Sequence, residues 1–167
     1  MISSDVIFGK NVALPQKELV NLFGCTIGDE TKIGAFVEIK KGVIIGRRCK
    51  IEPFVFIPEG ITIEDGVFIG PHVSFTNDPH PRATNEDGSI KLECNWTAKK
   101  THVKSGASIG AGAVILPGII IGKNAMVGAG SKILYHFSGS DLNFPYPGKK
   151  FRRYHNRNNL KGLIIMA

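Results

Sequence analysis

A period of six residues dominates the hydrophobic pattern in the first half of the chain. Every sixth residue is large and apolar without exception: Ile27, Ile33, Ile39, Ile45, Ile51, Ile57, Ile63, Ile69 and Phe75. The residue two places before each of them is small or β-branched. Neither a helix nor a single strand has this period. A fixed short period is the signature of a repeat architecture.

Each six-residue unit predicts one short strand followed by a corner. Side chains alternate along a strand, so positions two apart share one face. Polar and turn-forming segments such as Gly46-Arg47-Arg48 fill the rest of each unit. A unit this short cannot bury its apolar face alone, whereas stacked neighbours can. The pattern therefore predicts an all-β stack of coils.

The repeat is interrupted once, after Phe75. Residues 76–100 lose the period and are rich in proline and other turn formers, which predicts a loop. Loops of this length in compact domains are usually functional. Trp96, near the end of the loop, is expected to anchor it to the coils. The large apolar column then resumes at Val103, Ile109, Ile115, Ile121, Val127 and Ile133.

The two ends of the chain depart from the pattern. Residues 6–20 are expected to form an irregular first coil in which Phe8 fits the inward apolar pattern. Val20 continues the large apolar column, and the one extra residue between Val20 and Ile27 is expected to be accommodated near residues 21–24. The repeat stops at Tyr135. We expect one domain over residues 1–134 and, over residues 135–167, an irregular tail or cap.

The repeat closely resembles that of the hexapeptide-repeat acyltransferases. The resemblance implies a left-handed parallel β-helix of triangular section, with three six-residue units in each coil. Residues 21–31, 75–88 and 103–112 look like those of nucleotide-sugar N-acetyltransferases, most specifically in Phe75-Thr76-Asn77-Asp78 and the Pro-Arg-Ala that follows. Those enzymes acetylate an amino group on a UDP- or dTDP-linked sugar for surface glycans such as the O-antigen of lipopolysaccharide. The resemblance further implies acetyl-CoA as acyl donor and a homotrimer with active sites between subunits.

Composition adds limits to this interpretation. The 167 residues, 43% of them hydrophobic, suffice for one domain with a real core. The chain has no apolar run long enough for a membrane span, and its first residues lack a leader pattern, which together predict a cytoplasmic protein. Cys25 and Cys49 are expected as core thiols, and the role of Cys94 is open. Most of the net charge of +7 lies beyond residue 135, so the coils are not expected to bind nucleic acid.

Candidate polar groups cluster where the repeat breaks. Asn77 is predicted to hydrogen-bond or orient the sugar amine, with a turn that starts the loop as the alternative. Asp78 is a candidate proton acceptor or sugar ligand, or else an ordinary turn carboxylate. Arg82 suits either a substrate diphosphate or the internal structure of the loop.

Three histidines are candidates for a general base. His80 resembles the loop histidine that acts as base in sugar O-acetyltransferases of the galactoside and maltose type, although it also fits a solvated loop residue. His102 is expected to point outward near the loop, as base or substrate contact, and His72 is the weakest candidate. Their spacing does not match a metal site, so no metal is expected.

Glycine becomes frequent in the coils that follow the loop. Small residues let a ligand approach the backbone, and backbone N–H groups can stabilise an oxyanion. We therefore expect acetyl-CoA to lie along these coils, with two tail lysines near its phosphates. The predicted contacts are Gly106, Ala107, Gly110, Ala111, Gly112, Gly128, Lys149 and Lys150.

The leading functional prediction is an acetyl-CoA-dependent N-acetyltransferase for a nucleotide-linked amino sugar. A sugar O-acetyltransferase that uses His80 as base is one alternative, and a non-catalytic β-helix scaffold is another. A hydroxyl is less nucleophilic than an amine, so loss of His80 is expected to abolish O-acetylation and at most to weaken N-acetylation. The sequence leaves the sugar, the nucleotide and the ring position open.

Overall fold

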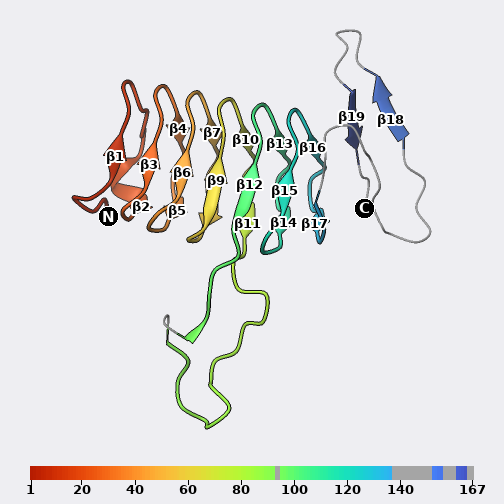
Figure 1. Ribbon diagram of the computed structural model, residues 1–167. Helices are drawn as coiled ribbons and strands as arrows, with labels where there is room; N and C mark the ends of the chain where they lie inside the picture. Colours follow the sequence, from red (N-terminus) through yellow and green to blue (C-terminus); the bar gives the residue numbers. More distant parts are fainter. Residues whose placement is uncertain (93–94, 137–151, 156–160, 165–167) are drawn as a thin grey trace.

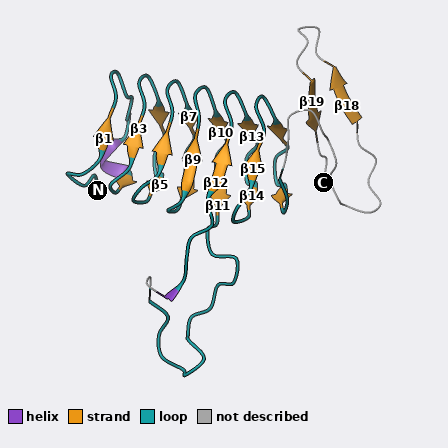
Figure 2. Cartoon of the chain, viewed as in Figure 1, coloured by secondary structure: helices purple, strands orange, loops and turns teal. Residues whose placement is uncertain are grey.

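The computed structural model is a three-sided stack of parallel coils with one long projecting loop (Figure 1). The structure describes residues 1–92, 95–136, 152–155 and 161–164. Each regular coil contributes one short strand to each of three sheets, and strands in neighbouring coils pair in parallel. The predicted left-handed β-helix of hexapeptide repeats is confirmed. Outside the strands nearly all of the described chain is loop or turn (Figure 2).

We call the three sheets faces I, II and III. Face I contains β1 (Ile7–Phe8), β3 (Thr26–Ile27), β6 (Ile44–Ile45), β9 (Ile61–Ile63), β12 (Thr101–Val103) and β15 (Ile120–Ile121). Face II contains β4 (Lys32–Ile33), β7 (Lys50–Ile51), β10 (Phe68–Ile69), β13 (Ser108–Ile109) and β16 (Met126–Val127). Face III contains β2 (Asn21–Leu22), β5 (Glu38–Ile39), β8 (Phe56–Ile57), β11 (Ser74–Phe75), β14 (Val114–Ile115) and β17 (Lys132–Ile133).

The apolar columns form the core inside the three faces. Both predicted inward columns are buried, and Ile39, Ile57 and Phe75 stack on face III with no exposed surface. Cys25 and Cys49 are buried free thiols, as predicted, and burial raises the pKa of Cys25 to about 11. Cys94 lies outside the described residues.

The first coil differs from the prediction. Val20 and Leu22 both face the core, so Leu22 holds the large apolar position and Val20 the small one. Leu22 pairs with Ile39, seventeen residues later, one fewer than in a regular coil. The short 3₁₀ helix η1 (Lys17–Leu19) precedes this shortened coil, and the extra residues are accommodated there, not near residues 21–24. Phe8, expected inside, is 40% exposed.

The long loop leaves the stack after β11 and returns at β12. The N–H of Lys99 donates to the carbonyl of Asn77, and the N–H of Thr101 donates to the carbonyl of Gly60 in the coil below. Val103 then pairs with Ile63, so the register of face I continues across the insertion. The loop is therefore an insertion at one corner that leaves the coil stack intact.

The C-terminal part contains regular structure that the sequence did not indicate. Strands β18 (Arg152–His155) and β19 (Lys161–Ile164) pair antiparallel within the segment that was expected to form an irregular tail or a cap. Within the described residues, no helix is long and apolar enough to cross a membrane.

Candidate active site

A histidine and a glutamate from adjacent coils meet on the outer surface of face I. His102 on β12 lies between Thr62 and Ile120 in the strand register, and its side chain faces outward as predicted. Its Nε2 atom is 2.8 Å from Oε1 of Glu64. Nε2 has no solvent contact and is out of line for a hydrogen bond to that carboxylate, whereas the side chain as a whole is 35% exposed. The accessible edge of the imidazole is therefore the one that carries Nδ1.

The carboxylate of Glu64 is held from three directions. Its Oε2 accepts hydrogen bonds from the Ser105 hydroxyl at 2.6 Å and the Ser105 N–H at 2.8 Å. The Lys104 ammonium lies 3.2 Å from Oε1. The Ser105 hydroxyl, followed by its N–H and by Lys104, lowers the pKa of Glu64 to about 2. Glu64 is thus a fixed anion beside the imidazole at neutral pH.

This arrangement assigns different tasks to the two ring nitrogens. An anionic oxygen at 2.8 Å favours a proton on Nε2. The opposite nitrogen, Nδ1, is then left as a proton acceptor on the accessible side of the ring. In typical general bases the histidine donates a hydrogen bond to its carboxylate partner, whereas here the attraction between the two groups is electrostatic and not a hydrogen bond.

Glu64 was not predicted from the sequence. A signal for it was present, because Ile63 and Val103 occupy the same apolar column on either side of the loop. Aligning the two columns places Glu64 and Lys104 side by side on the outer surface of face I.

Asn77 closes the root of the long loop. Its side-chain amide donates to the carbonyl of Glu59 at 3.2 Å, and its own carbonyl accepts the N–H of Lys99. Both contacts join parts of the chain that are far apart in sequence, so they are not the local turn considered as the alternative for this residue. Asn77 still stands at the strand end next to the base of the loop, where a substrate amine is expected.

Asp78 is the turn carboxylate of the loop. One of its oxygens accepts the N–H of His80 at 2.8 Å, and the other lies 3.2 Å from the Lys91 ammonium. The hydrogen bond from His80, and then Lys91, hold its pKa below the ordinary value. A carboxylate stabilised as the anion is a weak base, so this geometry does not support Asp78 as proton acceptor.

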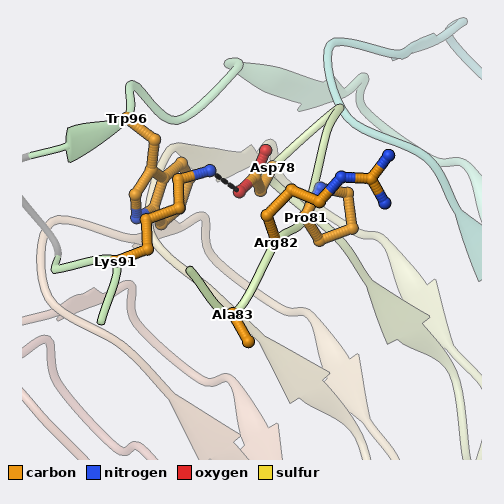
Figure 3. Close-up of a pocket in the computed structure, with 6 residues that line it drawn as sticks. All are labelled: Asp78, Pro81, Arg82, Ala83, Lys91 and Trp96. Atoms are coloured by element: carbon orange, nitrogen blue, oxygen red, sulfur yellow. Dashed lines mark hydrogen bonds and ion pairs between the residues drawn. The ribbon is translucent and has the colours of Figure 1, made fainter. Parts of the chain in front are cut away.

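The loop encloses an open pocket of about 330 Å³ (Figure 3). Its lining consists entirely of loop residues: Asp78, Pro81, Arg82, Ala83, Lys91 and Trp96. The guanidinium of Arg82 points away from the Lys91–Asp78 pair in Figure 3. Trp96 is half-buried and lines this pocket, and it is not among the described residues that pack on the core. Its predicted role as an anchor of the loop to the coils stays a prediction.

His80 is exposed and lies outside the lining of that pocket. Its N–H bonds to Asp78, and its carbonyl oxygen lies 3.5 Å from the Lys91 ammonium. The backbone of His80 is thus held by the loop. His102, in contrast, has a carboxylate beside its ring.

The structure separates the predicted acetyl-CoA contacts. Gly106 lies at the corner between faces I and II, whereas Gly110, Ala111, Gly112 and Gly128 lie at the corner between faces II and III. Ala107 is fully buried and is excluded as a side-chain contact, because its small side chain faces the core. Lys149 and Lys150 lie outside the described residues.

The glycines of this corner have different structural roles. A Cβ atom at Gly110 would lie 2.5 Å from the backbone nitrogen of Ala129, so this glycine is required for close packing of two coils. A Cβ atom at Gly112 would meet nothing within 4 Å, and its φ is +67°. Of these two, only Gly112 borders open space.

The described part of the chain contains no group of three histidine, cysteine, aspartate or glutamate side chains that could hold a metal ion.

Comparison with known proteins defines the class. The family model described as bacterial transferase hexapeptide (six repeats) matches residues 24–59, 42–77 and 100–134, which is just over half of the chain. The matched segments are the coils before and after the loop. The chain belongs to this family of hexapeptide-repeat transferases.

Individual relatives refine this picture. The bifunctional protein GlmU of Thermotoga maritima is 32% identical over 132 residues, covering 77% of this chain and 28% of the relative. The chain therefore spans less than a third of that protein. A galactoside O-acetyltransferase of Lactococcus lactis is 32% identical over 73 residues, covering 44% of this chain and 33% of the relative.

One group of solved structures shares the fold. A mutant of AntD, an N-acyltransferase from Bacillus cereus, was solved with dTDP-4-amino-4,6-dideoxyglucose and coenzyme A. It superposes with a TM-score of 0.61 at 20% identity, over 78% of this chain and 74% of AntD. At this identity the similarity establishes the fold alone.

Proposed function

We propose that this chain is an acetyl-CoA-dependent N-acetyltransferase that acts on the amino group of a UDP- or dTDP-linked amino sugar. The observation that carries the proposal is the His102–Glu64 pair, placed on an outer face next to the root of the long loop. The coenzyme A and nucleotide-linked amino sugar bound to AntD, which has the same fold, support this substrate class. The product would serve surface-glycan synthesis, such as that of lipopolysaccharide.

The reaction joins the sugar nitrogen to the acetyl carbon and breaks the thioester bond of acetyl-CoA. A neutral amine attacks the carbonyl carbon, and the nitrogen loses a proton as the bond forms. In the proposal Nδ1 of His102 accepts this proton, and Glu64 stabilises the resulting imidazolium. The same proton then passes to the departing thiolate. A positioned general base contributes about 10²–10⁴-fold to such a rate.

The loop supplies the proposed sugar-nucleotide site. The Lys91 ammonium is already paired with Asp78, so the positive charge for a substrate would come from Arg82, whose guanidinium points away from that pair and suits a diphosphate group. Asn77 holds the loop root and orients the amine from there. Acetyl-CoA would follow the open backbone at Gly112, with the tail lysines near its phosphates.

A homotrimer forms part of the proposal. Ile44 and Ile120 lie in the same outward column of face I as His102 and are 51% and 44% exposed. Exposed apolar side chains of this kind favour cover by another protein surface. A second copy on face I would place His102 in a cleft between subunits. We further propose that residues 1–134 form one domain capped by the tail, and that the enzyme acts in the cytoplasm.

A thiol-release assay tests the main proposal. The purified chain is mixed with acetyl-CoA and a panel of UDP- and dTDP-linked amino sugars, and free hydroxyl sugars serve as comparison. We expect coenzyme A release with at least one amino sugar and loss of that release in His102→Gln. Release with hydroxyl sugars alone would contradict N-acetylation, and failure to bind acetyl-CoA in calorimetry would favour a scaffold.

Sugar O-acetylation is the second candidate, favoured by the similarity to the galactoside O-acetyltransferase. In that reaction the exposed His80 would serve as base. The variant His80→Ala separates the candidates, because it should abolish O-acetylation and leave most N-acetylation. The non-catalytic scaffold remains the third alternative.

A further inference from the structure

Three aromatic rings stack along the corner between faces II and III. Phe36 and Phe54 have ring centroids 4.9 Å apart and planes inclined by 14°. Phe54 and His72 have centroids 4.7 Å apart and planes inclined by 2°. All three side chains are exposed, and all three residues have φ between 58° and 63°. We call this set the corner ladder.

The corner ladder ends at His72 because the next two equivalent residues are glycines. The N–H of His72 bonds to the carbonyl of Pro53, and the N–H of Gly112 bonds to that of Pro71 in the same way. Gly130 repeats this geometry one coil further on, with φ of 70°. A Cβ atom at Gly112 or Gly130 would meet nothing within 4 Å. The outer face of the His72 ring therefore borders a space two coils high with no side chain from the ladder.

We propose that the imidazole of His72 is a stacking platform for a nucleobase, which occupies the place of a fourth ring above Gly112. Neighbouring strands are about 4.8 Å apart, which suits one ring per coil. Offset parallel rings attract at centroid distances of about 4.5–7 Å. Aromatic side chains bind the bases of single-stranded nucleic acids in this manner because every base has a π-face.

Charge and position fit a nucleotide better than a neutral ring. Lys132 follows Gly130 by two residues, lies exposed on face III and can meet a phosphate. Asn77 at the loop root follows His72 by five residues, a span of about 16 Å in extended chain. A nucleotide anchored at His72 would thus extend across β11 toward the loop. The inference rests on the proposed function in one respect: both proposed substrates, acetyl-CoA and the nucleotide sugar, contain a nucleobase.

Calorimetric titration of the full chain with coenzyme A, UDP and dTDP separately tests the platform. The variant His72→Asn removes the ring but keeps a residue that tolerates positive φ. We expect it to weaken binding of at least one of these nucleotides about tenfold, equivalent to about 1.4 kcal/mol. His72→Phe should keep the affinity. The nucleotide that is weakened identifies which substrate uses the site.

Two further variants sharpen this test. Phe36→Asn makes the same change at the opposite end of the corner ladder and should leave affinity unchanged. Gly112→Phe would extend the ladder, because Phe54 already shows that a phenylalanine is accommodated at a similar positive φ on this corner. It should block binding while thermal unfolding shows a folded chain.

The inference is overturned if wild type binds none of the three nucleotides, or if His72→Asn and Gly112→Phe both bind as wild type does. Binding is measured without turnover. Absence of acyl transfer with nucleotide binding intact would therefore count against the proposed function and not against the stacking site.

Discussion

Nε2 of His102 lies 2.8 Å from Oε1 of Glu64, although the whole long loop separates the two residues in sequence. The contact exists because the loop leaves and re-enters the stack at one corner, where Lys99 bonds to Asn77. Strand β12 then pairs with β9 as if no insertion were present. The closing contact at Lys99 lies three residues before the proposed base. The strand register that follows this closure also aligns His102 with Glu64.

Replacing His102 tests the base directly. His102→Gln should lower kcat for N-acetylation by about 10²–10⁴-fold, because the proton acceptor is lost. Steady-state kinetics at saturating acetyl-CoA measures the effect. His80→Ala, which changes an exposed histidine of the loop, is the control and should keep kcat close to wild type. A His102→Gln enzyme within threefold of wild type would refute the assignment.

Glu64 should make stability depend on pH in acid. Its pKa is about 2 in the folded chain, against an ordinary value of 4.5 for a glutamate side chain. Because the folded pKa is the lower one, the carboxylate stabilises the fold above about pH 4.5, and this contribution is lost as pH falls from there toward 2. The difference in Tm between wild type and Glu64→Gln should therefore be largest near neutral pH and shrink toward about pH 3. A Tm difference between wild type and Glu64→Gln that stays constant across this pH range would contradict the prediction.

The buried hydroxyl of Thr31 should be important for stability. Its Oγ1 donates to the carbonyl of Gly46 at 2.8 Å and accepts the buried N–H of Cys49 at 3.0 Å. Thr31→Val keeps the shape and leaves that N–H without a partner, which should cost about 1–3 kcal/mol of unfolding free energy. Chemical denaturation measures it. Thr26→Val, on the outer surface of face I, is the matched control and should change stability by less than about 0.5 kcal/mol.

Two glycines of one coil should respond differently to alanine. Gly110→Ala places a Cβ atom 2.5 Å from the backbone of Ala129, so the coils must separate. This overpacking should cost about 1–3 kcal/mol. Gly112→Ala meets no atom and should cost about 1–2 kcal/mol through its positive φ alone. A substantial loss of acetyl-CoA affinity in Gly112→Ala, with the fold retained, would support ligand contact at that position.

Asn77 should control the order of the loop. Asn77→Ala removes the hydrogen bond to Glu59 and so loosens the loop root. We expect faster proteolysis within residues 76–100 and a higher KM for the nucleotide sugar, with kcat for bound substrate less affected. Asn85→Ala, which removes a contact to Ser89 within the same loop, is the control. Equal proteolysis rates in the two variants would argue against Asn77 as the closing contact.

Most of the fold could be predicted from the sequence because each repeat unit is local. The inward position of Ile39, Ile57 and Phe75 depends only on alternation within a strand and on a constant coil length. The same reasoning located the loop, since the period fails where the chain leaves the stack. The same reasoning failed at the start of the chain. There the helix η1, and the seventeen-residue step from Leu22 to Ile39, change the spacing and place Leu22 in the core.

The candidate site was only partly predictable. His102 could be placed on an outer face because it neighbours an inward position. Its partner Glu64 was missed, although aligning the apolar columns on either side of the loop would have indicated its position. The ring stack ending at His72 and the pocket around Trp96 could not be predicted, since each joins residues from different coils or from distant parts of the loop.

The sequence by itself determined which side chains face inward in the regular coils, where the stack is interrupted and to which family the chain belongs. Those properties follow from alternation and burial within single short strands. The tertiary structure alone decided which outward side chains meet, because contacts on the outer surface join residues one coil apart. For Glu64 and His102 that coil includes the loop, and only closure of the loop at its root sets the register between them.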